Sequence, residues 1–138
     1  MILVFPAAAQ KTKWAVEMQK NGYLLRFLPP NPSVVTLIRT IRQMVRSESA
    51  DIIHAHFSNY NFHACVVSLL LGWDHKKVQT LWHFHSDWKV TLTLKRKIKD
   101  LILYRILGQY AYGIAVSQGI KANIVFRGMP HQRIFYVP

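Results

Sequence analysis

The chain has 138 residues, of which 51% are hydrophobic and 17% charged, a composition that excludes an intrinsically disordered protein and suits one globular domain. Its 18 Lys and Arg residues outnumber its 6 Asp and Glu residues, so the formal net charge is +12 at pH 7. This excess favours an anionic partner, such as nucleic acid, an anionic membrane or a phosphorylated small molecule, and does not choose among them.

Cysteine content and apolar run length restrict the compartment. Cys65 is the single cysteine, so an internal disulfide is excluded, and its apolar surroundings in the sequence predict a buried thiol. We therefore expect a cytoplasmic location. No apolar run approaches the roughly 18 residues that a transmembrane helix needs, so any contact with a membrane is predicted to be peripheral.

Short apolar runs alternate with helical patterns along the whole chain. Strands are predicted at residues 2–5, 23–28, 51–56, 78–84, 113–117 and 134–137, and helices at 7–20, from 33 to about 46, 60–71, 92–110 and 119–127. Most of the strands lack polar alternation, as expected where helices cover both faces of a sheet. The pattern predicts an α/β fold: a doubly wound, Rossmann-like, mostly parallel sheet with helices on both faces, in a single domain over residues 1–138.

Residues with capping chemistry mark several helix ends. Ser33 is predicted to cap the start of the second helix. Gly22, Gly72 and Gly128 each follow a helical pattern and are predicted to end it. Ser117 follows the fifth strand, where it either caps the next helix or presents its hydroxyl to a substrate at that helix N-terminus.

Two His-x-His sequences end two of the predicted strands. His54 and His56 end the third strand, and His83 and His85 end the fourth. Residues two apart on a strand point to the same face, and open α/β sheets bind ligands beyond the carboxyl ends of their strands. The outermost histidines, His56 and His85, are therefore predicted to line a ligand crevice, and one histidine of each pair is expected to be buried inside its strand.

Two other interpretations of these histidines stay open. In the first, the histidines form hydrogen bonds with backbone or loop groups at the strand ends, which is a purely structural role. Alternatively, three or four imidazoles bind a metal, an interpretation that is disfavoured because no carboxylate or thiolate is placed as a further ligand. In the crevice interpretation, a histidine that titrates near neutrality acts as a general base or donates a hydrogen bond to an anion.

A basic run lies near the start of the longest predicted helix. It comprises Lys95, Arg96, Lys97 and Lys99, interleaved with the apolar residues Trp88, Leu92, Leu94 and Ile98. The run is either a solvated face or a contact for an anionic membrane or a lipid phosphate. Zinc-finger spacing, aromatic RNA-binding motifs, a Walker A loop and Gly-x-Gly-x-x-Gly are all absent from the sequence, which disfavours a nucleic-acid partner.

Several segments, taken in order, resemble the N-terminal domain of the family 4 glycosyltransferases, which are retaining enzymes of the GT-B fold. The segments are 42–56, which ends Asp-Ile-Ile-His-Ala-His; 78–85, a strand that ends in histidine; Tyr104-Arg105 followed by Ala115-Val116-Ser117; and Gly128-Met129-Pro130 followed by 134–138. Residues 6–10 depart from the family because they lack the glycines usual after its first strand. The order and spacing of the segments carry the resemblance.

The resemblance implies an enzyme that transfers a sugar from a nucleotide-sugar to a polysaccharide or glycolipid acceptor. It assigns His85 to the active site near the transferred sugar, and His56, Ser58 and Asn59 to the cleft. The N-terminal domain mainly holds the acceptor, and a second domain, absent from this chain, binds the donor, so the isolated chain is expected to be inactive. No metal or other cofactor is implied. The alternatives are a GT-B nucleotide-sugar 2-epimerase domain and a basic nucleic-acid-binding module.

Overall fold

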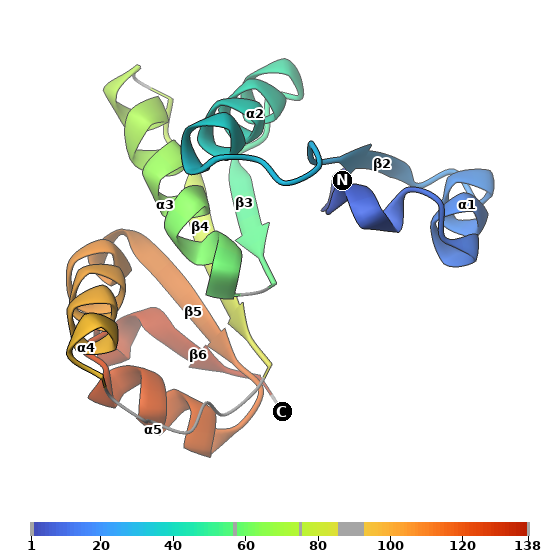
Figure 1. Ribbon diagram of the computed structural model, residues 1–138. Coiled ribbons are helices and arrows are strands. Elements are labelled where there is room, and N and C mark those ends of the chain that lie inside the picture. Colours follow the sequence, from blue (N-terminus) through green and yellow to red (C-terminus); the bar gives the residue numbers. More distant parts are fainter. Residues whose placement is uncertain (1, 57, 75, 86–92, 138) are drawn as a thin grey trace. The chain divides into compact units, whose positions relative to one another are not determined.

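The computed structural model describes residues 2–56, 58–74, 76–85 and 93–137, and the chain divides into two compact units, residues 1–41 and 42–138 (Figure 1). The first unit contains β1 (Ile2–Phe5), α1 (Lys13–Lys20) and β2 (Leu24–Phe27). The two strands are parallel, as the predicted strand–helix–strand pattern requires. Gly22 follows α1 with a φ of 83°, so it ends this helix in the predicted left-handed conformation.

The helix predicted over residues 7–20 is wrong in its first six residues. Residues Ala7–Ala9 form a separate 3-10 turn, and the Thr12 hydroxyl donates a hydrogen bond of 2.7 Å to the carbonyl of Ala9. The Thr12 backbone is extended, so α1 begins only at Lys13. The alanines carry no signal for this break, because alanine favours a helix in isolation.

Helix α2 (Val34–Ser47) begins in the first unit and ends in the second. The amide of Thr36 donates to the hydroxyl of Ser33 at 3.1 Å, which confirms the predicted N-cap. In the second unit, Arg42 and Arg46 both form ion pairs with Asp74, which lies just beyond α3.

The second unit is built on a four-stranded parallel sheet in the order β3-β4-β5-β6. Its elements are β3 (Ile52–Ala55), α3 (Ser58–Trp73), β4 (Gln79–Phe84), α4 (Leu94–Asp100), a π-helical turn (Leu101–Ile106), a 3-10 turn (Leu107–Tyr110), β5 (Ala111–Ala115), α5 (Gln118–Phe126), a 3-10 turn (His131–Arg133) and β6 (Ile134–Tyr136). Helix α3 packs along β3 and β4, and α5 packs along β5 and β6 (Figure 1). Parallel strands flanked by helices confirm the predicted α/β, Rossmann-like fold class.

One predicted helix boundary in this unit is wrong, and one predicted helix changes its type along its length. Gly72 does not end α3, because the helix continues to Trp73 and the Asp74 amide still donates to the carbonyl of Leu71. The helix predicted over 92–110 changes type twice, and its last four residues tighten into a 3-10 turn. Hydrophobic periodicity does not distinguish these helix types over so few turns.

One face of the sheet carries the hydrophobic core. Its buried residues are Ala55, Ala64, Cys65, Trp82, Phe84, Leu103, Tyr104, Leu107, Ala111, Ala115, Ile120, Ile124, Met129 and Ile134. The predicted buried thiol is confirmed: the Cys65 Sγ donates to the carbonyl of Leu107, and burial raises the pKa of this thiol to about 11. Cys65 is therefore protonated at neutral pH and unsuited to act as a nucleophile.

Among the described residues, no helix is both long enough and apolar enough to span a bilayer.

Ser117 caps α5, since its hydroxyl accepts a 3.1 Å hydrogen bond from the amide of Ile120. Replacing Ser117 by alanine is expected to lower the free energy of unfolding by about 1 kcal/mol, because an amide of the first turn loses its acceptor. Ser117→Asp keeps an acceptor at the same position and is expected to retain most of that stability. Urea unfolding of both variants checks this, and equal destabilisation by the two substitutions would contradict the capping role.

Candidate functional site

The parity of β3 and β4 places four histidines on the face of the sheet opposite the core. Ala55 is buried in the core, so its neighbours His54 and His56 point to the other face. Residues 80, 82 and 84 of β4 are buried in the same way, so His83 and His85 also point away from the core. The strands pair in parallel with Ala55 opposite Trp82, and His56 and His83 each follow that pair.

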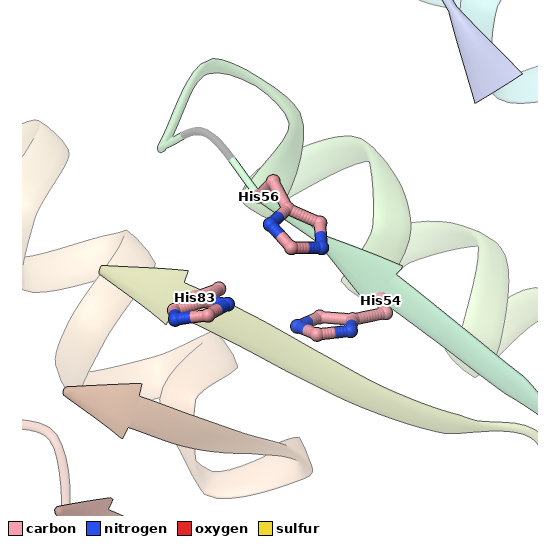
Figure 2. Close-up of side chains that lie close together, drawn as sticks. All are labelled: His54, His56 and His83. Carbon is pink, nitrogen blue, oxygen red and sulfur yellow. The ribbon is translucent and has the colours of Figure 1, made fainter. Parts of the chain in front are cut away.

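The four imidazoles form one group, which we call the histidine cluster: His54, His56, His83 and His85. Within a strand, the ring centroids lie 4.2 Å apart for His54 and His56 and 4.0 Å apart for His83 and His85. Between the strands, His83 lies 5.4 Å from His54 and 5.0 Å from His56. Figure 2 shows three of the rings gathered beside the ends of the two strands. The structure therefore brings the two His-x-His sequences into one site.

The two histidines predicted to line a crevice are in direct contact. The Nδ1 of His56 lies 3.2 Å from the Nε2 of His85, so one of these nitrogens donates to the other. Both side chains are exposed. The expectation that one histidine of each pair is buried is wrong, because His54 is exposed and His83 is half-buried. The core packs against the opposite face of both strands, so it does not bury these rings.

The surroundings of His54, His56 and His83 favour the neutral form of these three imidazoles. Burial, followed by the neighbouring histidines, lowers the pKa of His54 and of His56 from 6.5. The same causes lower the pKa of His83 to about 4. A neutral imidazole offers one donor and one lone pair, so at neutral pH these three rings can hydrogen-bond hydroxyls and phosphate oxygens or ligate a cation.

The lowered pKa of His83 predicts a loss of stability in mild acid. In the unfolded chain, His83 takes up a proton near pH 6.5. In the folded chain, where His54, His56 and His85 surround it, His83 stays neutral down to about pH 4. Its contribution is therefore complete above about pH 6.5 and is lost as the pH falls toward 4. The variant His83→Gln lacks this titration. Urea unfolding between pH 4 and 7 is expected to show a steeper loss for the unsubstituted chain, and parallel curves would contradict the prediction.

The other predicted site residues lie at the same edge of the sheet. Asn59 lies in the first turn of α3, is exposed, and accepts a 3.1 Å hydrogen bond from the Nδ1 of His63 through its carbonyl. Ser58 begins the same helix, and its side chain lies outside the described atoms. Ser117 follows β5, whose last residue, Ala115, pairs with the last residue of β4. Among the predicted site residues whose side chains are described, the structure brings His56 and His85 into direct contact.

The predicted basic run lies on α4. Lys97 and Lys99 are exposed, and Lys99 is close enough to His63 to help lower the pKa of that histidine, after burial. The side chains of Lys95 and Arg96, and the whole of Trp88 and Leu92, lie outside the described part of the chain. Exposed apolar residues accompany the run, and sequence reasoning missed that they continue beyond α4: Leu94, Ile98, Leu101, Ile102 and Ile106.

Comparison with solved structures gives the same fold. A lipopolysaccharide outer core galactosyltransferase, WaaB, in its apo form, aligns with a TM-score of 0.59 at 17% sequence identity. The alignment covers 100% of this chain and 46% of that structure, so the chain spans less than half the length of that protein. No curated protein matches the sequence.

A family model gives the identification. The model described as Glycosyltransferase Family 4 matches residues 6–138, which is nearly the whole chain and includes both His-x-His sequences. The resemblance found in the sequence is thereby confirmed, and it agrees with the parallel α/β architecture and with the aligned galactosyltransferase structure. The chain is a domain that belongs to glycosyltransferase family 4.

Proposed function

We propose that this chain is the N-terminal, acceptor-side domain of a retaining glycosyltransferase that moves a hexosyl group from a nucleotide-sugar to a polysaccharide or glycolipid acceptor. The observation that carries the proposal is the histidine cluster at the carboxyl ends of β3 and β4, in a domain of this family. Open α/β sheets bind ligands at such strand ends. The aligned structure is that of a galactosyltransferase of the lipopolysaccharide outer core, which supports a glycolipid or polysaccharide acceptor.

His85 is the proposed catalytic residue. Its ring is exposed at the end of β4 and holds a hydrogen bond with His56, which fixes the orientation of both rings. An imidazole held in this way donates a hydrogen bond to a hydroxyl of the transferred sugar while charge develops at the bond that breaks. The transfer proposed here needs no metal or other cofactor.

The N-termini of two helices supply the proposed substrate contacts. Ser58 and Asn59 start α3 directly after β3, and Ser117 caps α5 directly after β5. Helix N-termini present free amides and a positive dipole end, which suit phosphate or hydroxyl oxygens. These residues are proposed to bind the acceptor, together with His56.

The basic and apolar surface of α4 is proposed to meet an anionic membrane or a lipid phosphate on its cytoplasmic face. Lys97 and Lys99 are exposed beside the apolar Leu94 and Ile98, and the chain carries a net charge of +12. Lys95 and Arg96 belong to the same run in the sequence. Basic residues close to an anionic surface each contribute about 1 kcal/mol of attraction, so this surface holds the enzyme beside a lipid-linked acceptor.

Acceptor dependence tests the proposal. The full-length protein is incubated with a panel of radiolabelled nucleotide-sugars, with and without a lipid-linked glycan fraction. The expected result is label in the glycan only when the acceptor is present. Conversion of the donor without an acceptor indicates a nucleotide-sugar 2-epimerase instead. Salt-dependent binding to nucleic acid with no turnover of any donor indicates a nucleic-acid-binding module.

A further inference from the structure

We propose that His54, His56 and His83 together bind one divalent transition-metal cation of the Zn²⁺ class. Each of these side chains offers one ligand nitrogen, and the three nitrogens lie within 4.8 Å of one another. Figure 2 shows the three rings drawn together from two adjacent strands. Three histidines with water in the fourth position form a complete ligand set for zinc, so no carboxylate or thiolate is needed.

Binding a metal at these three histidines requires movement of their side chains only. In a tetrahedral site with Zn–N distances of about 2.05 Å, the ligand nitrogens lie about 3.3 Å apart. The three nitrogens therefore close by about 1.5 Å or less on binding, from separations of at most 4.8 Å. The side chain of His54 is exposed and has room to turn, while the paired strands β3 and β4 fix the backbone positions of the ligands.

Hydrogen bonding around the cluster fits a bound cation. The Nδ1 of His56 is engaged with His85, which leaves the Nε2 of His56 to bind the metal. A second partner on the other ring nitrogen is the usual arrangement of a metal-ligating histidine, and here His85 supplies it. The Nδ1 of His83 is buried and has no hydrogen-bond partner within the described ranges, so no hydrogen bond of this atom competes with a metal.

The ligand set also selects the class of cation. Three imidazoles are neutral nitrogen ligands, which suit Zn²⁺, Cu²⁺, Ni²⁺ and Co²⁺. Mg²⁺ and Ca²⁺ require oxygen ligands, and no carboxylate of the described residues belongs to the group. Binding does not depend on sugar transfer. If the proposed function holds, a bound cation occupies His56 and inhibits transfer, and this consequence alone rests on the proposed function.

Calorimetric titration of the metal-free, full-length protein with Zn²⁺ tests the proposal, with protein prepared without a polyhistidine tag. One high-affinity site is expected, and Co²⁺ at that site is expected to give the visible absorption of tetrahedral cobalt. His85→Gln removes the outer partner of a ligand and is expected to weaken Zn²⁺ binding by roughly 10–100-fold. His54→Gln and His83→Gln each remove a ligand and are expected to weaken binding by more than that.

The matched control is His131→Gln, which removes an exposed histidine outside the cluster and is expected to leave the affinity unchanged. Circular dichroism of every variant verifies that it is folded. Absence of a high-affinity Zn²⁺ site, or equal affinity in the cluster variants and the control, would overturn the proposal. Millimolar Mg²⁺ displacing Zn²⁺ would overturn the assigned ligand set. Because these readouts need no turnover, their failure is distinguishable from failure of the glycosyltransferase proposal.

Discussion

Replacing His85 by alanine in the full-length protein is expected to lower kcat for sugar transfer by about 10²–10³-fold, the effect typical of losing one donor to a developing charge. The hydrogen-bond donor is lost because the alanine side chain has no N–H group. His56 is left without the partner that lies 3.2 Å from its Nδ1, so its ring also loses its fixed orientation. Steady-state kinetics with saturating nucleotide-sugar measure the effect.

Two comparisons make this result specific. His131→Ala removes an exposed histidine from the turn before β6 and is expected to leave kcat within twofold of the unsubstituted enzyme. The variant His85→Asn keeps a hydrogen-bond donor and is expected to recover part of the lost kcat. Unaltered turnover in His85→Ala would remove this residue from the mechanism, and an equal loss in His131→Ala would attribute the effect to general damage.

Replacing Trp82 by alanine is expected to lower the free energy of unfolding by about 3–5 kcal/mol, the cost typical of truncating a buried aromatic residue. Trp82 is 0% exposed, and its ring meets those of Phe84 and Tyr104 edge-on at centroid distances of 6.4 and 6.3 Å. The substitution would leave a cavity between β4 and the helical turn that carries Tyr104. Urea unfolding followed by far-ultraviolet circular dichroism measures the loss without relying on tryptophan fluorescence.

Two further tryptophan variants serve as controls. Trp73 is 80% exposed at the end of α3, so Trp73→Ala is expected to change stability by no more than about 0.5 kcal/mol. The indole nitrogen of Trp82 is buried without a hydrogen-bond partner in the part of the chain that is described, so Trp82→Phe removes an unsatisfied donor as well as volume. Trp82→Phe is therefore expected to cost less than Trp82→Ala, and the reverse order would contradict this account of the core.

Much of the fold was predictable from local chemistry. The strands appeared as short apolar runs, Gly22 and Gly128 ended helices with φ values of 83° and 106°, and Ser33 and Ser117 capped the helices that follow them. These features depend on a few neighbouring residues and one backbone conformation, so the sequence states them directly. The start of α1 at Lys13 and the end of α3 at Trp73 were not predicted, because alanines favour a helix where the structure breaks it and Gly72 does not end one.

The histidine cluster was predictable only in part. Residue parity placed the histidines of each His-x-His on one face, but the sequence did not show that β3 and β4 are neighbours with Ala55 opposite Trp82. From the sequence alone, one histidine of each pair is expected to be buried in its strand, and the metal interpretation is disfavoured for want of a carboxylate or thiolate. Because consecutive parallel strands usually lie side by side, the sequence does indicate that the two His-x-His sequences end near each other. The exposed apolar residues beyond α4 were missed for a different reason, because a helical stripe predicts a buried face.

Histidine side-chain NMR tests most directly the central claim that the cluster is the substrate site. The chain contains only seven histidines, so ¹⁵N-histidine labelling of this segment in the full-length protein gives a small set of assignable ring signals. Addition of nucleotide-sugar and acceptor is predicted to shift the signals of His56 and His85, which share a hydrogen bond, and to leave that of the exposed His131 in place. Unchanged signals from the whole cluster while sugar transfer proceeds would contradict the account.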